Sequence, residues 1–173
     1  MYKYIDIPND VKFLYEEFET SNSRVLVETG CNYGDRLLWA KQLNYEKMYS
    51  CDIFKNRVDF CLELAKKNDF SLVCLNKNSI EFLAEILPTI NQRVLFWLDA
   101  HGEGGGVPLL EELTLISKHT IRNHDIFIDD IQSYFKSQTD KICSMIKEIN
   151  TNYQIKFIDT SIKENVLIAK IYE

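Results

Sequence analysis

Residues 24–34 read Arg-Val-Leu-Val-Glu-Thr-Gly-Cys-Asn-Tyr-Gly, and this stretch decides the fold. The apolar run at 25–27 has the length and β-branched content of a buried strand. Gly30 and Gly34 follow, and a helical pattern then covers residues 35–43. A strand, a glycine turn and a helix in this order let a parallel α/β sheet present backbone N–H groups to a small ligand.

The glycines of the chain are concentrated at two places. Two of the six lie in this opening unit, and the other four lie between Gly102 and Gly106. We therefore interpret the two places as halves of one site, with the second as a mobile wall of a pocket.

Length and composition predict one soluble domain over residues 1–173, with a helical lead-in over 1–23. The net charge of −6 argues against a nucleic-acid partner, and the apolar runs are too short to cross a membrane. No secretory signal is recognised, so we expect a cytoplasmic protein, and self-association is left open. The five cysteines are odd in number and form no Cys-x-x-Cys pair, which favours buried free thiols in a reducing compartment.

The rest of the chain alternates between strand and helix patterns. Strands are expected at 25–27, 47–52, 70–75, 93–98, 125–128, 153–158 and 165–172, and helices at 35–43, 56–68, 79–87, 108–118 and 133–149. The joint between the last two strands is too short for a parallel crossover, so we expect them to pair antiparallel. This order predicts an α/β fold with a doubly wound, Rossmann-like sheet of seven strands, mostly parallel, with helices on both faces and a C-terminal antiparallel hairpin.

Helix starts suggest two further details. Asn9 or Asp10 is a candidate cap for an amphipathic helix with the apolar stripe Val11, Phe13, Leu14 and Phe18, which either packs on the sheet or serves as a lid. Ser79 is a candidate cap for the helix over 79–87. His119 and His124 are interpreted as structural.

Acidic side chains stand where the predicted parallel strands end: Glu28, Asp52, Asp99, Asp129 and Asp130. Ligands of such sheets bind outside the carboxyl ends of the strands. Because each buried acid needs solvent or a partner, acids at four strand ends on one edge indicate a site rather than packing.

A dinucleotide ligand fits the glycine turn poorly. A pyrophosphate requires Gly-x-Gly-x-x-Gly, whereas Asn32 stands at the middle position here. A nicotinamide oxidoreductase is therefore the weaker hypothesis.

The chain resembles the class I S-adenosylmethionine-dependent methyltransferases over nearly its whole length. Their first motif is an acid followed by Gly-x-x-x-Gly, as Glu28, Gly30 and Gly34 stand here. The resemblance implies that this loop, with Asn32 and Tyr33, wraps the methionine part of the cofactor. It further implies that Asp52 accepts hydrogen bonds from the ribose hydroxyls and that Asn78 and Ser79 lie near the adenine.

The second half of the chain suggests a cation. We expect Asp99, Asp129 and Asp130 to converge, and no basic residue adjoins them in the sequence. Converging carboxylates repel each other unless some are protonated or a cation lies among them, and hard oxygen ligands favour Mg²⁺ or Mn²⁺. His101 is a candidate fourth ligand or general base, and Asp99 is a second candidate catalytic residue that also borders the cofactor. Asp129 and Asp130 could instead cap the following segment.

This arrangement resembles the metal-dependent macrocin-type sugar O-methyltransferases. That resemblance implies metal ligands at Asp99, Asp129 and Asp130, with His101 where the family has an acid. The sequence thus predicts a Mg²⁺-assisted O-methyltransferase acting on a hydroxyl of a sugar or glycan. The alternatives are another small acceptor such as a catechol, or a cofactor-binding module without catalysis.

Overall fold

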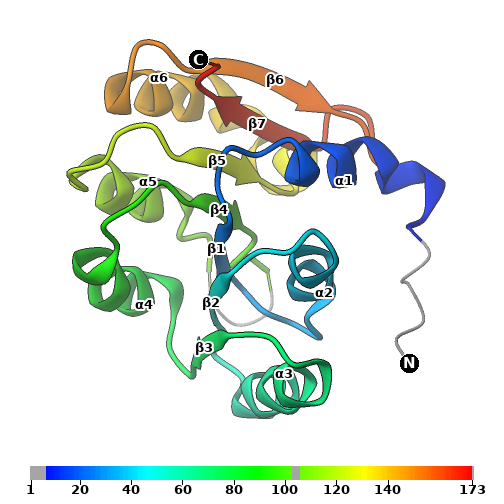
Figure 1. The fold of residues 1–173 in the computed structure, drawn as a ribbon. Helices are drawn as coiled ribbons and strands as arrows, with labels where there is room; N and C mark the ends of the chain where they lie inside the picture. The colour runs from blue at the N-terminus through cyan, green and yellow to red at the C-terminus, as the bar shows by residue number, and fades with distance from the viewer. Residues whose placement is uncertain (1–6, 103–105, 173) are drawn as a thin grey trace.

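The structure is a computed structural model that describes residues 7–102 and 106–172 (Figure 1). Its centre is one seven-stranded sheet in the order β3-β2-β1-β4-β5-β7-β6. The strands are β1 Val25–Thr29, β2 Lys47–Cys51, β3 Leu72–Leu75, β4 Leu95–Leu98, β5 Asp125–Ile128, β6 Gln154–Ile158 and β7 Val166–Lys170. The first five strands pair in parallel, and β7 pairs antiparallel with both β5 and β6. The predicted doubly wound sheet with a C-terminal hairpin is confirmed.

Helices cover both faces of the sheet. The α-helices are α1 Lys12–Glu19, α2 Asp35–Gln42, α3 Lys55–Asn68, α4 Ser79–Ile86, α5 Leu109–Ser117 and α6 Thr139–Ile149, and short 3₁₀ turns lie at η1 Asn9–Val11, η2 Leu87–Thr89 and η4 Lys136–Gln138. Helices α1, α2 and α3 share a core with one face, and α4, α5 and α6 share a core with the other (Figure 1). None of the helices in the described part of the chain is both long and apolar enough to span a membrane.

The central strands are buried on both faces, as their continuous apolar sequences predict. In β4, Phe96 and Leu98 face the core with α4 to α6, whereas Leu95 and Trp97 face the core with α1 to α3. The ends of three strands are in register, because Leu98 pairs with both Thr29 and Ile128. The residues that follow these strands therefore leave the sheet at one edge.

Helix α1 packs on the sheet rather than covering a ligand site. Leu14 and Phe18 are fully buried, and the Phe18 ring contacts the rings of Trp97 and Phe127 on the central strands. Phe13 was expected in the apolar stripe, but it is 67% exposed. The reason is helical geometry, because the stripe is narrow and Phe13 lies beside it. No side chain caps α1, so the expected Asn9 or Asp10 cap is wrong.

Two other local predictions need correction. The helix expected from residue 133 begins as an α-helix only at Thr139, and a π-helical turn η3 Ile131–Phe135 and the turn η4 precede it. Asn78 rather than Ser79 caps α4, because the Asn78 side chain accepts a hydrogen bond from the Glu81 N–H at 2.9 Å. The free thiols are as expected, since all five cysteines are unpaired and four are buried.

Candidate active site

A cavity of about 750 Å³ opens at the carboxyl edge of the parallel strands. Its walls come from the segments after β1, β2 and β4, from the start of α4 and from the residues before α5. The predicted site residues that line it are Gly30, Asn32, Asp52, Asn78, Ser79, Asp99 and His101. The edge where the sequence predicted a ligand is therefore hollow, and most of the predicted residues reach it.

The glycine turn after β1 lies directly against the end of β4. Gly30 has φ +86°, and a Cβ there would lie 2.8 Å from the Asp99 carbonyl oxygen. The N–H groups of Gly30 and Cys31 both donate to the Cys51 carbonyl at the end of β2, at 3.1 and 2.8 Å. Only glycine fits this close approach, which joins the ends of three strands around the cavity.

Asp52 is held rigidly at the cavity wall. Its Oδ1 accepts from the Phe54 N–H at 2.9 Å, and its Oδ2 accepts from the Asn32 N–H at 3.1 Å. The Arg57 guanidinium lies 3.8 Å from Oδ2. Each carboxylate oxygen has two acceptor sites, so the carboxylate keeps capacity for further donors such as the hydroxyl pair of a ribose.

Asn78 and Ser79 border the same part of the cavity but differ in their bonding. The side-chain oxygen Oδ1 of Asn78 accepts the hydrogen bond that caps α4, which leaves the side-chain NH₂ group for other partners. The Ser79 hydroxyl is buried next to the buried Glu112 carboxyl, and its hydrogen bond partly offsets the burial that raises the pKa of Glu112.

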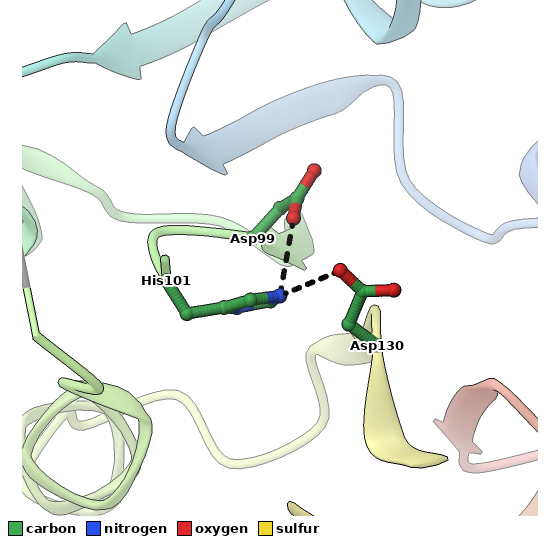
Figure 2. A group of neighbouring side chains, drawn as sticks. All are labelled: Asp99, His101 and Asp130. Carbon is green, nitrogen blue, oxygen red and sulfur yellow. Dashed lines mark hydrogen bonds and ion pairs between the residues drawn. The ribbon is translucent and has the colours of Figure 1, made fainter. Parts of the chain in front are cut away.

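At the other side of the cavity, Asp99, His101 and Asp130 form one cluster (Figure 2). His101 Nε2 lies 3.1 Å from Asp130 Oδ2 and 3.5 Å from Asp99 Oδ1, and Figure 2 shows the imidazole pointing between the two carboxylates. One ligand atom from each residue lies within 4.8 Å of the others, a spacing that suits a metal ion. The sequence predicted that Asp99, Asp129 and Asp130 converge; the structure places Asp99 and Asp130 around His101, and Asp129 is not part of this cluster.

The charges in this cluster are coupled. Burial, together with the charges of Asp129 and Asp130, raises the pKa of Asp99 to about 7. Burial alone would lower the pKa of His101, but the hydrogen bond with Asp130 and the nearby carboxylates raise it. The hydrogen bond from His101 in turn lowers the pKa of Asp130. The carboxylates therefore favour positive charge between them, which either a protonated His101 or a bound cation would supply.

Arg36 is a site residue that the sequence analysis missed. Its guanidinium lies over the rings of Trp39 and Trp97, at 4.0 and 4.8 Å from their centroids. Its charge partly offsets the burial that raises the pKa values of Asp99 and Asp129. The expectation of carboxylates without basic neighbours is therefore wrong, since Arg36 is distant from them in the sequence but close in the fold.

Tyr134 is the second missed residue. It lies in the π-helical turn after β5, lines the cavity and is 45% exposed, with its ring centroid 4.7 Å from that of His101. The signal in the sequence was its position four residues after Asp130, at the end of a central strand.

Five predicted residues are not part of the cavity wall. Within the described part of the chain, Glu28, Tyr33, Gly34, Asp129 and Asp130 are not among the residues that line it, although Asp130 contacts the lining residue His101. Glu28 is buried and accepts a hydrogen bond from the Ser50 hydroxyl at 2.6 Å, and burial raises its pKa to about 8. Asp129 Oδ1 accepts from the Asp130 N–H at 2.8 Å. Their roles toward a cofactor or metal stay predictions, and residues 103–105 of the second glycine segment lie outside the described residues.

No protein-family model matches the chain, and none of the curated proteins matches its sequence. Solved structures do match its fold. An O-methyltransferase from Bacillus cereus, solved with S-adenosylhomocysteine, superposes with a TM-score of 0.69 at 10% identity over 99% of this chain and 84% of its own. The chain has a methyltransferase fold.

Other structures with the methyltransferase fold differ in what they act on. TomG from Streptomyces achromogenes, an O-methyltransferase of tomaymycin synthesis solved with S-adenosylmethionine, has a TM-score of 0.64 at 11% identity, covering 98% of this chain and 82% of its own. A ribosomal protein L11 methylase from Lactobacillus delbrueckii has a TM-score of 0.60 at 15% identity, covering 92% and 76%. The fold is thus shared by methyltransferases that differ in what they act on, so it does not by itself decide the function of this chain.

Proposed function

We propose that this chain is an S-adenosylmethionine-dependent O-methyltransferase that methylates a hydroxyl of a sugar or glycan with the assistance of Mg²⁺. The observation that carries the proposal is one continuous cavity that is lined by Asp52 on one side and by Asp99 and His101 on the other. The first side suits a ribose, and the second suits a hydroxyl that must lose a proton.

The cofactor half of the cavity fits S-adenosylmethionine by its chemistry. The carboxylate of Asp52 would accept from the ribose hydroxyls, and Asn78 and Ser79 would border the adenine. The turn from Gly30 to Gly34 would enclose the methionine part, above the buried Glu28. The carboxylate of Asp52, which accepts from the Asn32 N–H of this turn, disfavours a pyrophosphate and favours a cofactor with ammonium and sulfonium charges.

The acceptor half fits a divalent cation. Asp99 and Asp130, with Asp129 beside them, would hold Mg²⁺, and the imidazole of His101 also suits Mn²⁺. When bound, the cation supplies Lewis acidity that lowers the pKa of a coordinated hydroxyl.

The protein side chains supply the remaining chemistry. His101 Nε2 and the Asp99 carboxylate lie 3.5 Å apart and are the candidate acceptors of the hydroxyl proton. The walls of the cavity would hold the acceptor oxygen in line with the methyl group, because methyl transfer is a displacement at a carbon that the sulfonium already activates. Tyr134 and Val107 also line the cavity and would border the acceptor.

One observation favours a second acceptor class. The exposed ring of Tyr134 and the apolar side chain of Val107 both line this half of the cavity, and they would also accommodate a planar catechol. A non-catalytic cofactor-binding module is the alternative from another class, and it predicts cofactor binding without turnover on any acceptor.

The proposal is tested by following methyl transfer from labelled S-adenosylmethionine to a panel of sugars, glycans and catechols, with and without EDTA. We expect turnover on a sugar or glycan, loss in EDTA and recovery with Mg²⁺ or Mn²⁺. Asp99→Asn should lower the rate by at least about 100-fold, in the range of a general base, whereas the matched change Asp140→Asn on α6 should leave it unchanged. Full activity in EDTA would contradict the proposed role of the metal ion. Transfer to catechols alone would show that the proposed sugar or glycan acceptor is wrong.

A further inference from the structure

The turn that carries Asp130 is held by the C-terminal hairpin. Asp130 follows β5 with φ +56°, a left-handed conformation that costs a non-glycine residue free energy. Asn165 immediately precedes β7, and its carbonyl oxygen accepts from the Ile131 N–H at 2.8 Å. Its side-chain Nδ2 also donates to Asp130 Oδ1 at 2.9 Å. One residue of the hairpin therefore fixes both the backbone and the side chain of this turn.

The orientation of the Asn165 amide follows from its partner. Asp130 Oδ1 is a carboxylate oxygen and can only accept, so the amide must present its NH₂ group to it. The Asn165 oxygen then faces away, and it is buried without a hydrogen-bond partner among the described residues. Asn165 is 4% exposed, so this arrangement is built into the interior.

The two oxygens of Asp130 have different partners as a result. Oδ1 is bound to Asn165, and Oδ2 is 3.1 Å from His101 Nε2 in the cavity cluster. A carboxylate bound at one oxygen cannot rotate freely, so the other oxygen stays directed at His101 and Asp99. This is the way in which a partner outside the ligand set orients a ligand.

We propose that Asn165 is a positioning residue that directs Asp130 Oδ2 into the site. The proposal rests on the proposed function, because it concerns the same cation and the same acceptor half of the cavity. It assigns to the hairpin turn a role in the site that its sequence position, 35 residues after Asp130, does not suggest.

The test measures binding rather than turnover. Mn²⁺ alone is titrated by electron paramagnetic resonance, and S-adenosylhomocysteine by calorimetry, into the wild-type chain, Asn165→Ala and Asn165→Leu. We expect both variants to bind Mn²⁺ about 10- to 100-fold more weakly, the range for loss of such an orienting partner. S-adenosylhomocysteine affinity should change less than about twofold, since Asp52 lies at the other side of the cavity.

Asn68→Ala is the matched control for stability. Asn68 is also a buried asparagine with one side-chain hydrogen bond, to the Leu64 carbonyl, but it lies at the end of α3 outside the cavity. Its change should lower the thermal midpoint by a similar amount without altering Mn²⁺ affinity. Crystal structures of the Asn165 variants should show Asp130 in a different rotamer.

The outcomes separate the two proposals. Wild-type-like Mn²⁺ affinity in the Asn165 variants would overturn the positioning role alone and leave the metal site intact. Absence of Mn²⁺ binding in the wild-type chain would overturn the metal part of the proposed function, and the positioning role with it. Equal loss of Mn²⁺ and S-adenosylhomocysteine affinity would show general disruption and would also contradict the positioning role.

Discussion

At the scale of single residues, His124 and its hydrogen-bonded neighbour His119 show how burial fixes a protonation state. His124 is fully buried, and its Nδ1 lies 3.1 Å from the Val94 N–H and must accept from it. Its Nε2 therefore carries the proton and donates to His119 Nδ1 at 3.0 Å. His119 Nε2 then donates to the carbonyls of Leu87 and Ile90, both at 3.1 Å. This chain of donors requires both rings to be neutral, in agreement with the predicted structural roles.

We predict that His124 makes the fold acid-sensitive. Burial, with the nearby charge of Arg93, lowers the pKa of His124 to about 3 in the folded chain, against about 6.5 in the unfolded chain. Below pH 6.5 the unfolded chain binds a proton that the folded chain does not, so stability falls as the pH falls toward 3. His124→Asn keeps an acceptor for the Val94 N–H and removes the titration. The stability advantage of the wild-type chain over this variant, from urea unfolding, should shrink by about 2 kcal/mol between pH 7 and pH 5. A constant difference between the two pH values would contradict the neutral assignment.

At the scale of the elements, the glycine turn after β1 provides a prediction with a built-in control. Gly30 and Gly106 both have positive φ, but a Cβ at Gly30 would meet the Asp99 carbonyl at 2.8 Å, whereas a Cβ at Gly106 would meet nothing within 4 Å. Gly106→Ala should cost about 1 kcal/mol of unfolding free energy, from backbone strain alone. Gly30→Ala should cost a further ~1–3 kcal/mol from the clash and weaken S-adenosylhomocysteine binding. Urea unfolding measures the stability of the two variants, and calorimetry measures their S-adenosylhomocysteine affinity. Equal losses of unfolding free energy in both variants would contradict the prediction, because they would show that the end of β4 moves to accommodate the added methyl group.

A second element-scale prediction concerns how α1 is attached to β7. Lys170 is 3% exposed, and its ammonium donates to the Glu17 carbonyl, the Glu17 carboxylate and the Thr20 hydroxyl at 2.8, 2.9 and 3.2 Å. Lys156 reaches the other Glu17 oxygen from an exposed position. Lys170→Met should cost about 3 kcal/mol, as for a broken buried pair, and Lys156→Met less than about 1 kcal/mol. Thermal unfolding compares them, and a smaller cost for Lys170→Met than for Lys156→Met would argue against α1 as a fixed part of the core.

The sequence predicts some of these elements better than others. The strands were found because buried parallel strands are continuously apolar and end in polar residues, as β4 does before Asp99. The π-helical turn Ile131–Phe135 was not found, because Ile131 and Phe135 are spaced as on an ordinary α-helix. Asn78 and Ser79 are adjacent residues of cap-forming types, so only the backbone geometry decides between them.

At the scale of the whole molecule, the sequence predicts the edge of the sheet at which the site lies, but not the residues that other parts of the chain bring to it. Asp99, His101 and Asp130 converge because parallel strands end at one edge, which follows from the β-α order. Arg36 and Asn165 could not be placed in this way. The approach of Asn165 to Asp130 requires β7 rather than β6 to lie beside β5, and an antiparallel hairpin satisfies its own hydrogen bonds in either order.

We propose that one cavity of the molecule holds a positively charged methyl donor next to a divalent cation. The most direct measurement is a crystal structure with S-adenosylhomocysteine and Mn²⁺, recorded with anomalous scattering at the manganese edge. We predict density for the ribose hydroxyls at Asp52 and an anomalous peak between Asp99 and Asp130. An S-adenosylhomocysteine molecule bound elsewhere, or a fully occupied cofactor with no anomalous peak at these carboxylates, would contradict the account.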